Sequence, residues 1–465
     1  MSAPFATRAR FEVARELVST AAQAACLPAA YAEHAFLRDA RRAALATDLA
    51  LPPAEPPPPP DPLAHAAALR ARPLELFVAC AEASGEIHGR AWLAALRSEL
   101  ERIGAPPPRV RLLASPAFGA ADVERLDDPV SRAAMGLSGI ASQAPYYLNL
   151  CARVARSLRE RPADLFLPVD SPALHVPLAR IARRAGARVV HLVAPQYWGW
   201  APWRAPRYRA AVDLCLCLFA FEPAWFARAG IDAQWVGHAL WDALPPVAPR
   251  TRAHASESGP PLLALLPGSR GALVERCLPW MLERARALHA REPALAVRVF
   301  QERPERREQV QACIARAGAG AWAALAEEPL HVGLQRCRAA LSVSGTVLLD
   351  LLHQRLPTVV IYRLAHAREV RLRPLLLDAP YIALPNLLAN RALLPEHVFA
   401  GDGPTAAVEA EVAALLADPA ARARTRSGLE LAARRLGPPG AALRAARWTL
   451  AAAADAAAQR GAPAP

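Results

Sequence analysis

The 465-residue sequence contains no lysine, so all 55 of its basic side chains are arginines. Without lysine the chain has no Walker-type phosphate loop, no Schiff-base nucleophile and no Ser–Lys dyad. The formal charge of +13 at pH 7 is consistent with phosphates or an anionic membrane surface as partners. Because alanine and proline are also abundant, we interpret part of the arginine excess as a composition bias.

Two further absences narrow the class of protein. None of the 8 cysteines has the CxxC spacing of a zinc site, so we expect reduced, buried thiols in a cytoplasmic protein. No apolar run approaches the ~20 residues that span a bilayer. Arg8, Arg10 and Glu12 interrupt the apolar core that a secretory signal would need. Any membrane contact is therefore expected to be peripheral.

Short apolar runs alternate with helical patterns in two series. This alternation is typical of parallel sheets covered on both faces, and a helix is predicted over 87–103 after the first run. The sequence therefore predicts an α/β protein with two tandem Rossmann-like, doubly wound domains. The runs are 74–80, 163–170, 188–195 and 213–221 in the first series, and 262–266, 294–301, 339–346 and 358–363 in the second.

Composition shifts divide the chain into five segments. In open α/β sheets ligands bind beyond the carboxyl ends of the strands, so we expect the site in the cleft between the two sheet domains. The segments are a helical extension with a proline-rich linker (1–73), a first sheet domain (74–242), a linker (243–261), a second sheet domain (262–410) and closing helices (411–465).

Three loops of small residues follow strands and precede helices: ASGE (83–86), PGSR (267–270) and SGT (344–346). Free N–H groups at a helix start bind anions, and glycine lets a ligand approach the main chain. For any one loop, simple helix capping is the alternative. Together the loops favour a phosphate or diphosphate site made by Ser84, Gly85, Glu86, Gly268, Ser269, Ser344, Gly345 and Thr346.

Four other polar residues could carry chemistry, and each has a plainer interpretation. Asp170 ends a strand and could take a proton from a hydroxyl nucleophile, or it could simply form a turn. Arg270 has a forked donor array suited to phosphate, or lies on the surface. Asp350 could accept hydrogen bonds from a ribose, or face solvent. His238 could donate to a phosphate or sugar, or be a structural histidine.

Two apolar segments could meet a ligand or a membrane. The aromatic stretch PQYWGWAPWR (195–204) could bind a ring or an acyl chain, and packing under a loop is the alternative. The stretch 135–150 contains Tyr146 and Tyr147 and is flanked by arginines. It could lie at a membrane interface, where aromatic rings prefer the headgroup level, or pack in the core.

Several strings together resemble the lipid-A-disaccharide synthase family of inverting glycosyltransferases. They occur in the family's order and cover about residues 74–430. The resemblance implies the GT-B arrangement of two Rossmann-like domains. The strings are AEASGEIHG (81–89), MGL (135–137), PVDSP (168–172), APQYWGW (194–200), AFEPAWFARAGIDAQWVGHAL (220–240), LLPGSRGALVE (265–275), SVSGTVLLD (342–350) and YIALPNLLANRALLPE (381–396).

The resemblance implies a reaction and a role for each matching residue. The enzyme would transfer 2,3-diacylglucosamine from its UDP derivative to the 6-hydroxyl of 2,3-diacylglucosamine 1-phosphate, giving a β(1→6) disaccharide and UDP. Asp170 would be the catalytic carboxylate and Arg270 the arginine required for activity. Asp350 would lie near the ribose, where the family usually has Glu. The substrate-binding set would be Ser84, Gly85, Glu86, His238, Gly268, Ser269, Glu275, Ser344, Gly345, Thr346, Asp350 and Asn386.

The implied partners are a UDP-sugar donor, an acylated glucosamine phosphate acceptor and the cytoplasmic face of the inner membrane. A homodimer is a further implication of the family. We expect no cofactor, no metal and no nucleic acid. Two alternatives stay open: a family member that binds a nucleotide or lipid without turnover, suggested by altered motifs in the first domain, and a transferase that uses another UDP sugar.

Overall fold

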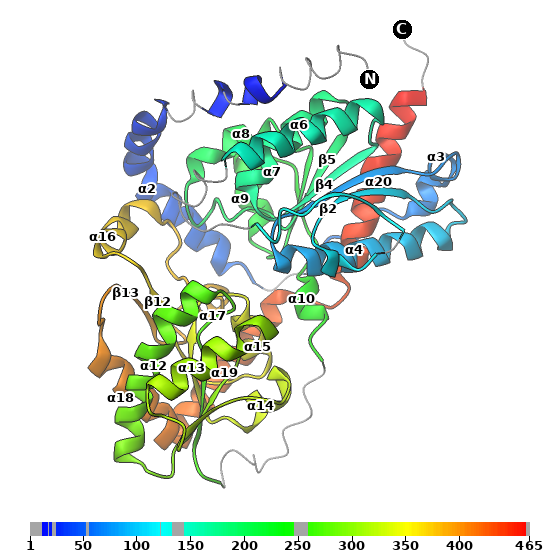
Figure 1. Cartoon of the computed structure of the whole chain (residues 1–465). Coiled ribbons are helices and arrows are strands. Elements are labelled where there is room, and N and C mark those ends of the chain that lie inside the picture. Colours follow the sequence, from blue (N-terminus) through cyan, green and yellow to red (C-terminus); the bar gives the residue numbers. More distant parts are fainter. Residues whose placement is uncertain are drawn as a thin grey trace. The chain divides into compact units, whose positions relative to one another are not determined.

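The computed structural model describes residues 12–16, 18–20, 25–52, 55–120, 122–132, 144–245 and 259–461 (Figure 1). The chain forms two compact units, one made of residues 1–242 with 437–465 and one made of residues 243–436. Each unit contains its own sheet and its own hydrophobic core. The predicted α/β class with two parallel-sheet domains and a helical N-terminal extension is confirmed.

The first unit is built on a parallel sheet in the order β3-β2-β1-β4-β5-β6-β7. Its core is formed by apolar side chains from the strands and the covering helices, among them Phe77 and Phe166. Such continuous apolar strands are typical of a sheet buried on both faces. The strands are β1 (Glu75–Cys80), β2 (Arg109–Leu113), β3 (Glu124–Asp127), β4 (Leu165–Val169), β5 (Arg188–Leu192), β6 (Leu214–Cys217) and β7 (Ala233–Trp235).

Helices join and cover these strands. Helix α20, from the end of the chain, packs against α4, where Trp92 Nε1 donates to Thr449 Oγ1 at 2.9 Å (Figure 1). The closing segment of the chain therefore completes the first unit. The helices are α3 (Ala66–Arg70), α4 (Ala83–Arg102), α6 (Ala144–Glu160), α7 (Pro172–Arg184), α8 (Ala205–Arg209), α9 (Glu222–Arg228), α10 (Ala239–Asp242) and α20 (Ala441–Gly461).

The N-terminal extension is anchored on the first unit. Helix α2 (Leu27–Ala50) contacts α9, and its Asp48 forms an ion pair with Arg228. Glu16 of the preceding helical segment is buried and forms ion pairs with Arg184 and Arg207. No helix within the described ranges is long and apolar enough to cross a membrane.

The second unit repeats the plan with the parallel order β10-β9-β8-β11-β12-β13. Its strands are β8 (Leu262–Leu266), β9 (Ala296–Val299), β10 (Ala323–Leu325), β11 (Ala339–Val343), β12 (Thr358–Arg363) and β13 (Glu396–Phe399). Its helices are α12 (Gly271–Arg291), α13 (Arg307–Arg316), α14 (Leu330–Arg336), α15 (Val347–His353), α16 (Ala367–Leu376), α17 (Leu384–Ala389), α18 (Thr405–Ala417) and α19 (Pro419–Ala433).

The structure corrects one predicted boundary. The helix expected from residue 87 begins at Ala83, so ASGE is the first turn of α4 and not a loop before it. Glu86 supports this early start, because an acidic side chain in the first turn complements the positive end of the helix. The string MGL (135–137) and most of the 135–150 segment lie outside the described residues.

Candidate functional site

Each sheet reverses its strand order at one point, and the predicted site residues gather at these two points. The reversal lies between β1 and β4 in the first sheet and between β8 and β11 in the second. At a reversal the connecting helices leave to opposite faces, which opens a crevice beyond the carboxyl ends of the two central strands. The segments that follow these four strands contain ASGE, Asp170, PGSR and SGT.

In the first unit the start of α4 lies directly against the end of β4. A Cβ added to Gly85 would be 3.4 Å from the carbonyl oxygen of Val169, so the two backbones approach closely. Ser84, beside this contact, is half-buried. The approach brings the first turn of α4 next to Asp170, which follows Val169 and is half-buried. ASGE and Asp170 are thus neighbours within one unit.

The backbone at Asp170 has an unusual conformation. Asp170 has a φ of 55° and Ser171 a φ of 47°. This left-handed region costs a residue with a side chain about 1–2 kcal/mol, so the surroundings must enforce it. The main-chain N–H of Asp170 donates to the carbonyl of Leu192 at 2.9 Å. Its carbonyl oxygen lies 2.6 Å from His175 Nδ1 and 3.0 Å from His191 Nε2.

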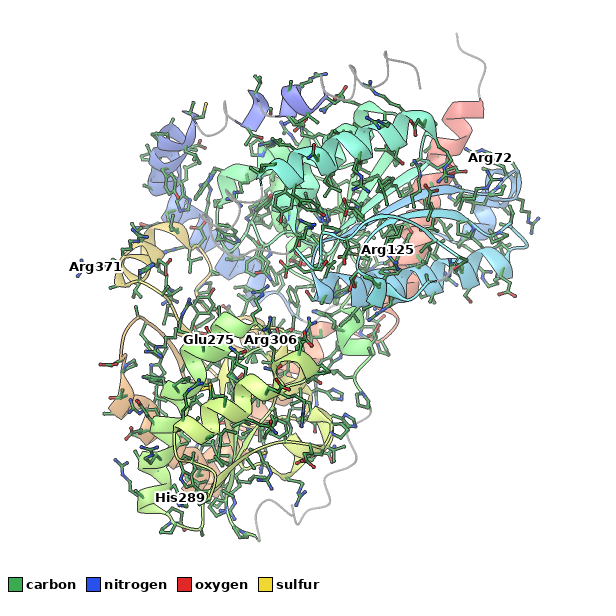
Figure 2. All side chains as sticks on the ribbon, in the orientation of Figure 1. Arg72, Arg125, Glu275, His289, Arg306 and Arg371 are labelled. Atoms are coloured by element: carbon green, nitrogen blue, oxygen red, sulfur yellow. The ribbon has the colours of Figure 1, made fainter. Side chains whose placement is uncertain are left out.

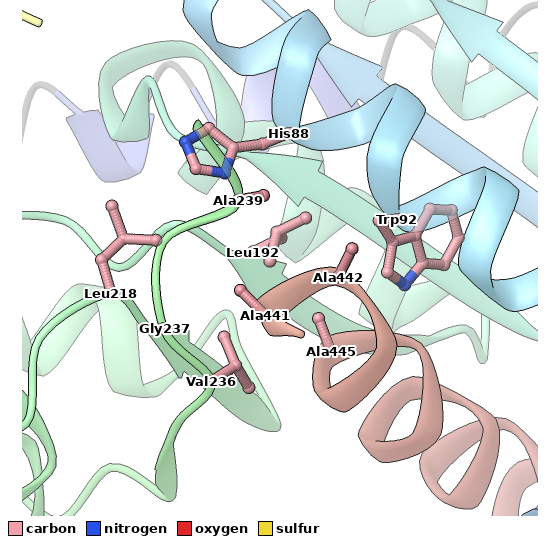
Figure 3. Close-up of a pocket in the computed structure, with 10 residues that line it drawn as sticks. All are labelled: His88, Trp92, Leu192, Leu218, Val236, Gly237, Ala239, Ala441, Ala442 and Ala445. Atoms are coloured by element: carbon pink, nitrogen blue, oxygen red, sulfur yellow. The ribbon is translucent and has the colours of Figure 1, made fainter. Parts of the chain in front are cut away.

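Two more histidines lie near the start of α4. The rings of His88 and His238 are 5.0 Å apart, and burial lowers the pKa of His88 to about 4 and that of His238 to about 3. Both are therefore neutral near pH 7, so His238 could offer a ligand an N–H group but no positive charge. His88 also lines a pocket between α4 and α20 (Figure 3). The other residues that line this pocket are apolar, which does not suit an anion.

Two buried glutamates support the loops of the first unit. Glu86 accepts hydrogen bonds from the N–H of Ser115 at 2.6 Å and from its hydroxyl at 3.0 Å. Glu222 accepts from Trp198 Nε1 at 2.9 Å and from two main-chain N–H groups. Burial raises the pKa of Glu222 to about 7, and these donors oppose the rise. Both carboxylates hold loops in place.

In the second unit the PGSR and SGT loops are immediate neighbours. Gly268 has a φ of 96°, and a Cβ added to it would lie 3.1 Å from Cγ2 of Val343, the residue before Ser344. Ser344 Oγ donates to the carbonyl of Ile382 at 3.4 Å, which adds the YIALPN segment to the cluster. Around Gly345 an added Cβ would meet nothing within 4 Å. The loops thus leave open main chain beside two helix starts.

Positive charge is concentrated where α12 begins. Ser269 and Arg270 are exposed, and Arg270 is the residue just before the helix. A Cβ on Gly271 would lie 3.1 Å from Nη1 of Arg306, so a second guanidinium lies against the same end (Figure 2). The first turn of α12 contains no acidic residue. Because a helix start is itself partly positive, cations there are unfavourable until an anion binds.

Two further residues of the predicted set make contacts within the second unit. Glu275 accepts a hydrogen bond from Gln309 Nε2 at 2.9 Å. Asn386 is fully buried, and its NH₂ group donates to the Leu394 carbonyl at 2.8 Å and to Glu396 at 3.1 Å. Its oxygen accepts from the N–H groups of Leu393 and Leu394. This uses the whole hydrogen-bonding capacity of the amide, so a direct bond to a ligand would have to replace one of these.

Asp350 lies on α15, four residues after Thr346, and is partly buried. Burial raises the pKa of Asp350 to about 7, and the negative charge of Glu302 adds to the rise. A carboxyl group that changes charge near neutral pH, next to a candidate nucleotide loop, is typical of a functional site. Thr346 and Gly345 themselves are exposed.

Several supporting residues were not predicted from the sequence. His175, His191 and Arg306 make the contacts above, and Gln301 Nε2 donates to the carbonyl of Gly268 at 3.0 Å. Apart from His175, which lies five residues after Asp170, these residues are at least twenty positions from their partners in the sequence, so no local motif marks them. One signal was available: His191 lies in an otherwise apolar strand, where a buried polar side chain needs a reason.

The chain matches one family model over residues 76–430, described as lipid-A-disaccharide synthetase. A lipid-A-disaccharide synthase of Azotobacter vinelandii is 35% identical over 346 residues, which cover 72% of this chain and 88% of the relative. One of Pseudomonas fluorescens is 33% identical over 328 residues, which cover 70% and 84%.

Solved structures of low sequence identity share the fold. A putative UDP-N-acetylglucosamine 2-epimerase of Listeria monocytogenes superimposes with a TM-score of 0.53 at 13% identity, covering 80% of this chain and 94% of that one. The UDP co-structure of S. aureus MnaA gives a TM-score of 0.52 at 12% identity, covering 79% and 94%. At this identity the likeness concerns the fold alone.

The close approach of the PGSR and SGT loops predicts the effect of Gly268→Ala. A side chain at this φ costs about 1–2 kcal/mol, and the contact with Val343 adds to that cost. Chemical denaturation of the full-length protein should show this loss in the free energy of unfolding. Gly345→Ala is the matched control, because its Cβ enters open space, and should change the free energy of unfolding by less than about 0.5 kcal/mol. Equal losses for the two variants would contradict the described packing.

The raised pKa of Asp350 predicts a pH-dependent stability. Its folded pKa of about 7 exceeds the ordinary pKa of 3.8 for this side chain, so between these values the folded state binds more protons than the unfolded state. Asp350 therefore destabilises the fold progressively as pH rises toward 7. The melting temperature of Asp350→Asn, minus that of the wild type, should grow from pH 5 to pH 7 and then level off. Glu302→Gln should move this rise to lower pH, and a difference independent of pH would refute the assignment.

Proposed function

The chain belongs to the lipid-A-disaccharide synthetase family, and from this membership we propose how its two units divide the synthesis of the lipid A disaccharide. It is an inverting hexosyltransferase. It transfers 2,3-diacylglucosamine from UDP-2,3-diacylglucosamine to 2,3-diacylglucosamine 1-phosphate, forming a β(1→6) bond and releasing UDP. The single observation that carries the assignment of residues is the position of Asp170, PGSR and SGT at the two strand-order reversals.

The first unit binds the acceptor and activates it. Inverting transfer needs a base that removes the proton from the acceptor 6-hydroxyl as that oxygen attacks the anomeric carbon. Asp170 is the base, because it is a half-buried carboxylate at the carboxyl end of a central strand. Ser84 and the first turn of α4 lie beside it and orient the sugar. His238 adds a neutral N–H donor or an acceptor nitrogen.

The second unit holds the donor and stabilises the leaving group. Negative charge develops on the diphosphate as the glycosidic bond breaks, and prearranged donors lower the energy of that state. The main-chain N–H groups of 268–270 and 345–346, with the guanidinium groups of Arg270 and Arg306, supply this stabilisation. Asp350, as the carboxylate, accepts hydrogen bonds from the ribose hydroxyls. Asn386 and Glu275 act indirectly, by fixing the loops.

The enzyme works at the cytoplasmic face of the inner membrane, where its acylated substrates reside. Helix α16 supports a surface contact, because none of its residues whose burial the structure describes is buried. Arg368 and Arg371 are exposed on it, and so is 47% of Leu372 (Figure 2). Arginines near an anionic leaflet contribute about 1 kcal/mol each to attraction, and leucine beside them inserts at the headgroup level.

The division of roles predicts different defects for two substitutions. Asp170→Asn should lower kcat by about 10²- to 10⁴-fold and leave the affinity for UDP unchanged. Arg270→Ala should lower kcat by about 10²- to 10³-fold and weaken UDP binding as well. The rate of UDP release during turnover measures kcat, and calorimetric titration with UDP measures the affinity for UDP. The controls are Asp122→Asn and Arg424→Ala, whose side chains are 68% and 72% exposed. Wild-type turnover by Asp170→Asn would end the assignment of the base.

The exposed basic helix predicts weaker membrane binding when its charge is removed. The double variant Arg368→Gln, Arg371→Gln should bind vesicles of phosphatidylcholine with phosphatidylglycerol about thirtyfold more weakly, because two arginines at about 1 kcal/mol each contribute about 2 kcal/mol. Vesicles of phosphatidylcholine alone should not distinguish it from the wild type. Arg424→Gln with Arg434→Gln removes the same charge from α19 and the residue after it, and should keep wild-type binding. Equal losses in both double variants would show that α16 has no special role.

A further inference from the structure

The carbonyl oxygen of Asp170 is held by two imidazole groups. His175 comes from the first turn of α7, and His191 from β5, the strand next to β4. Their ring nitrogens lie 2.6 Å and 3.0 Å from the same oxygen. A carbonyl only accepts hydrogen bonds, so His175 must carry its proton on Nδ1 and His191 on Nε2. Together with the bond from the Asp170 N–H to Leu192, this fixes both sides of the residue.

We propose that His175 and His191 are positioning residues, which set the direction of the Asp170 carboxylate by fixing the main chain from which it projects. The proposal rests on the role of Asp170 as the base. The two donors hold the peptide group between Asp170 and Ser171, both of which have the left-handed conformation, and without them this peptide group would lose its two side-chain contacts. The carboxylate would then sample other directions, and a base that is misplaced by about 1 Å can lose 10²-fold in rate.

The chemistry of the two histidines favours this role over simple packing. Both are fully buried, and burial lowers the pKa of His175 to about 4 and that of His191 to about 3, so both stay neutral donors. His175 Nε2 and Ser171 Oγ are buried without a hydrogen-bond partner among the described residues. An apolar side chain would avoid this desolvation cost. The hydrogen bonds from the two imidazole N–H groups to Asp170 are what offsets the cost of burying these polar rings.

The test compares variants that remove the donor with variants that keep it. His175→Leu and His191→Leu remove the N–H, whereas the amides of His175→Asn and His191→Gln can place an N–H near Nδ1 and Nε2. The leucine variants should lower kcat at least about thirtyfold, with the KM for the UDP sugar and the affinity for UDP within about twofold of wild type. The amide variants should recover kcat to within about fivefold. If a leucine variant does not fold, His175→Phe or His191→Phe takes its place, and we expect the same loss of kcat from it.

A matched control separates positioning from a general loss of structure. His289 on α12 also holds a carbonyl through its ring, with Nδ1 2.9 Å from the oxygen of Leu295, far from the loops along its helix (Figure 2). His289→Leu should keep wild-type kcat. Folded donor-free variants with wild-type kcat would overturn the proposal, and so would amide variants no better than leucine. If Asp170→Asn itself keeps wild-type kcat, then Asp170 is not the base, and this outcome overturns the proposed function and not only the role of the histidines.

Discussion

The structure depends on one feature of its two parallel sheets: the strand order reverses once in each of them. At that place, two loops follow adjacent strands without a helix crossing between them. Here the reversals lie at β1/β4 and β8/β11. Residues separated by more than seventy positions along the chain, such as Gly268 and Val343, thereby become neighbours. Each loop of the site is only three or four residues long, and the sheet brings these short loops together.

Unfavourable local features are concentrated at these same positions. Asp170 and Ser171 adopt left-handed backbone conformations, Asp350 is a partly buried carboxyl group, and Arg270 and Arg306 lie at the positive end of α12. The backbone strain and the buried carboxyl group each lower the stability of the ligand-free protein. A fold tolerates such features where a ligand or a reaction uses them. The two arginines and the helix start suit a diphosphate, because its negative charge would interact favourably with both guanidinium groups and with the partial positive charge of the helix start.

The sequence predicted the fold and the loops well, and the supporting contacts poorly. Strands such as β8 and β12 were predicted at their observed bounds, because continuous apolar runs are typical of buried parallel strands. Five strands were missed, because they are short and several contain charged side chains; they are β2, β3, β7, β10 and β13. The predicted loop ASGE proved to be helical. Asn386 was predicted as a ligand contact from the family resemblance, and its saturated hydrogen bonds became visible only in three dimensions.

We expect the diphosphate of the donor to bind where the loops after β8 and β11 meet, and a crystal structure of the enzyme with UDP bound would show whether it does. Diphosphate oxygens should lie within hydrogen-bonding distance of main-chain N–H groups in 268–270 and 345–346, with the guanidinium of Arg270 against one phosphate. A diphosphate bound elsewhere, with these two loops unoccupied and Arg270 turned to solvent, would contradict it.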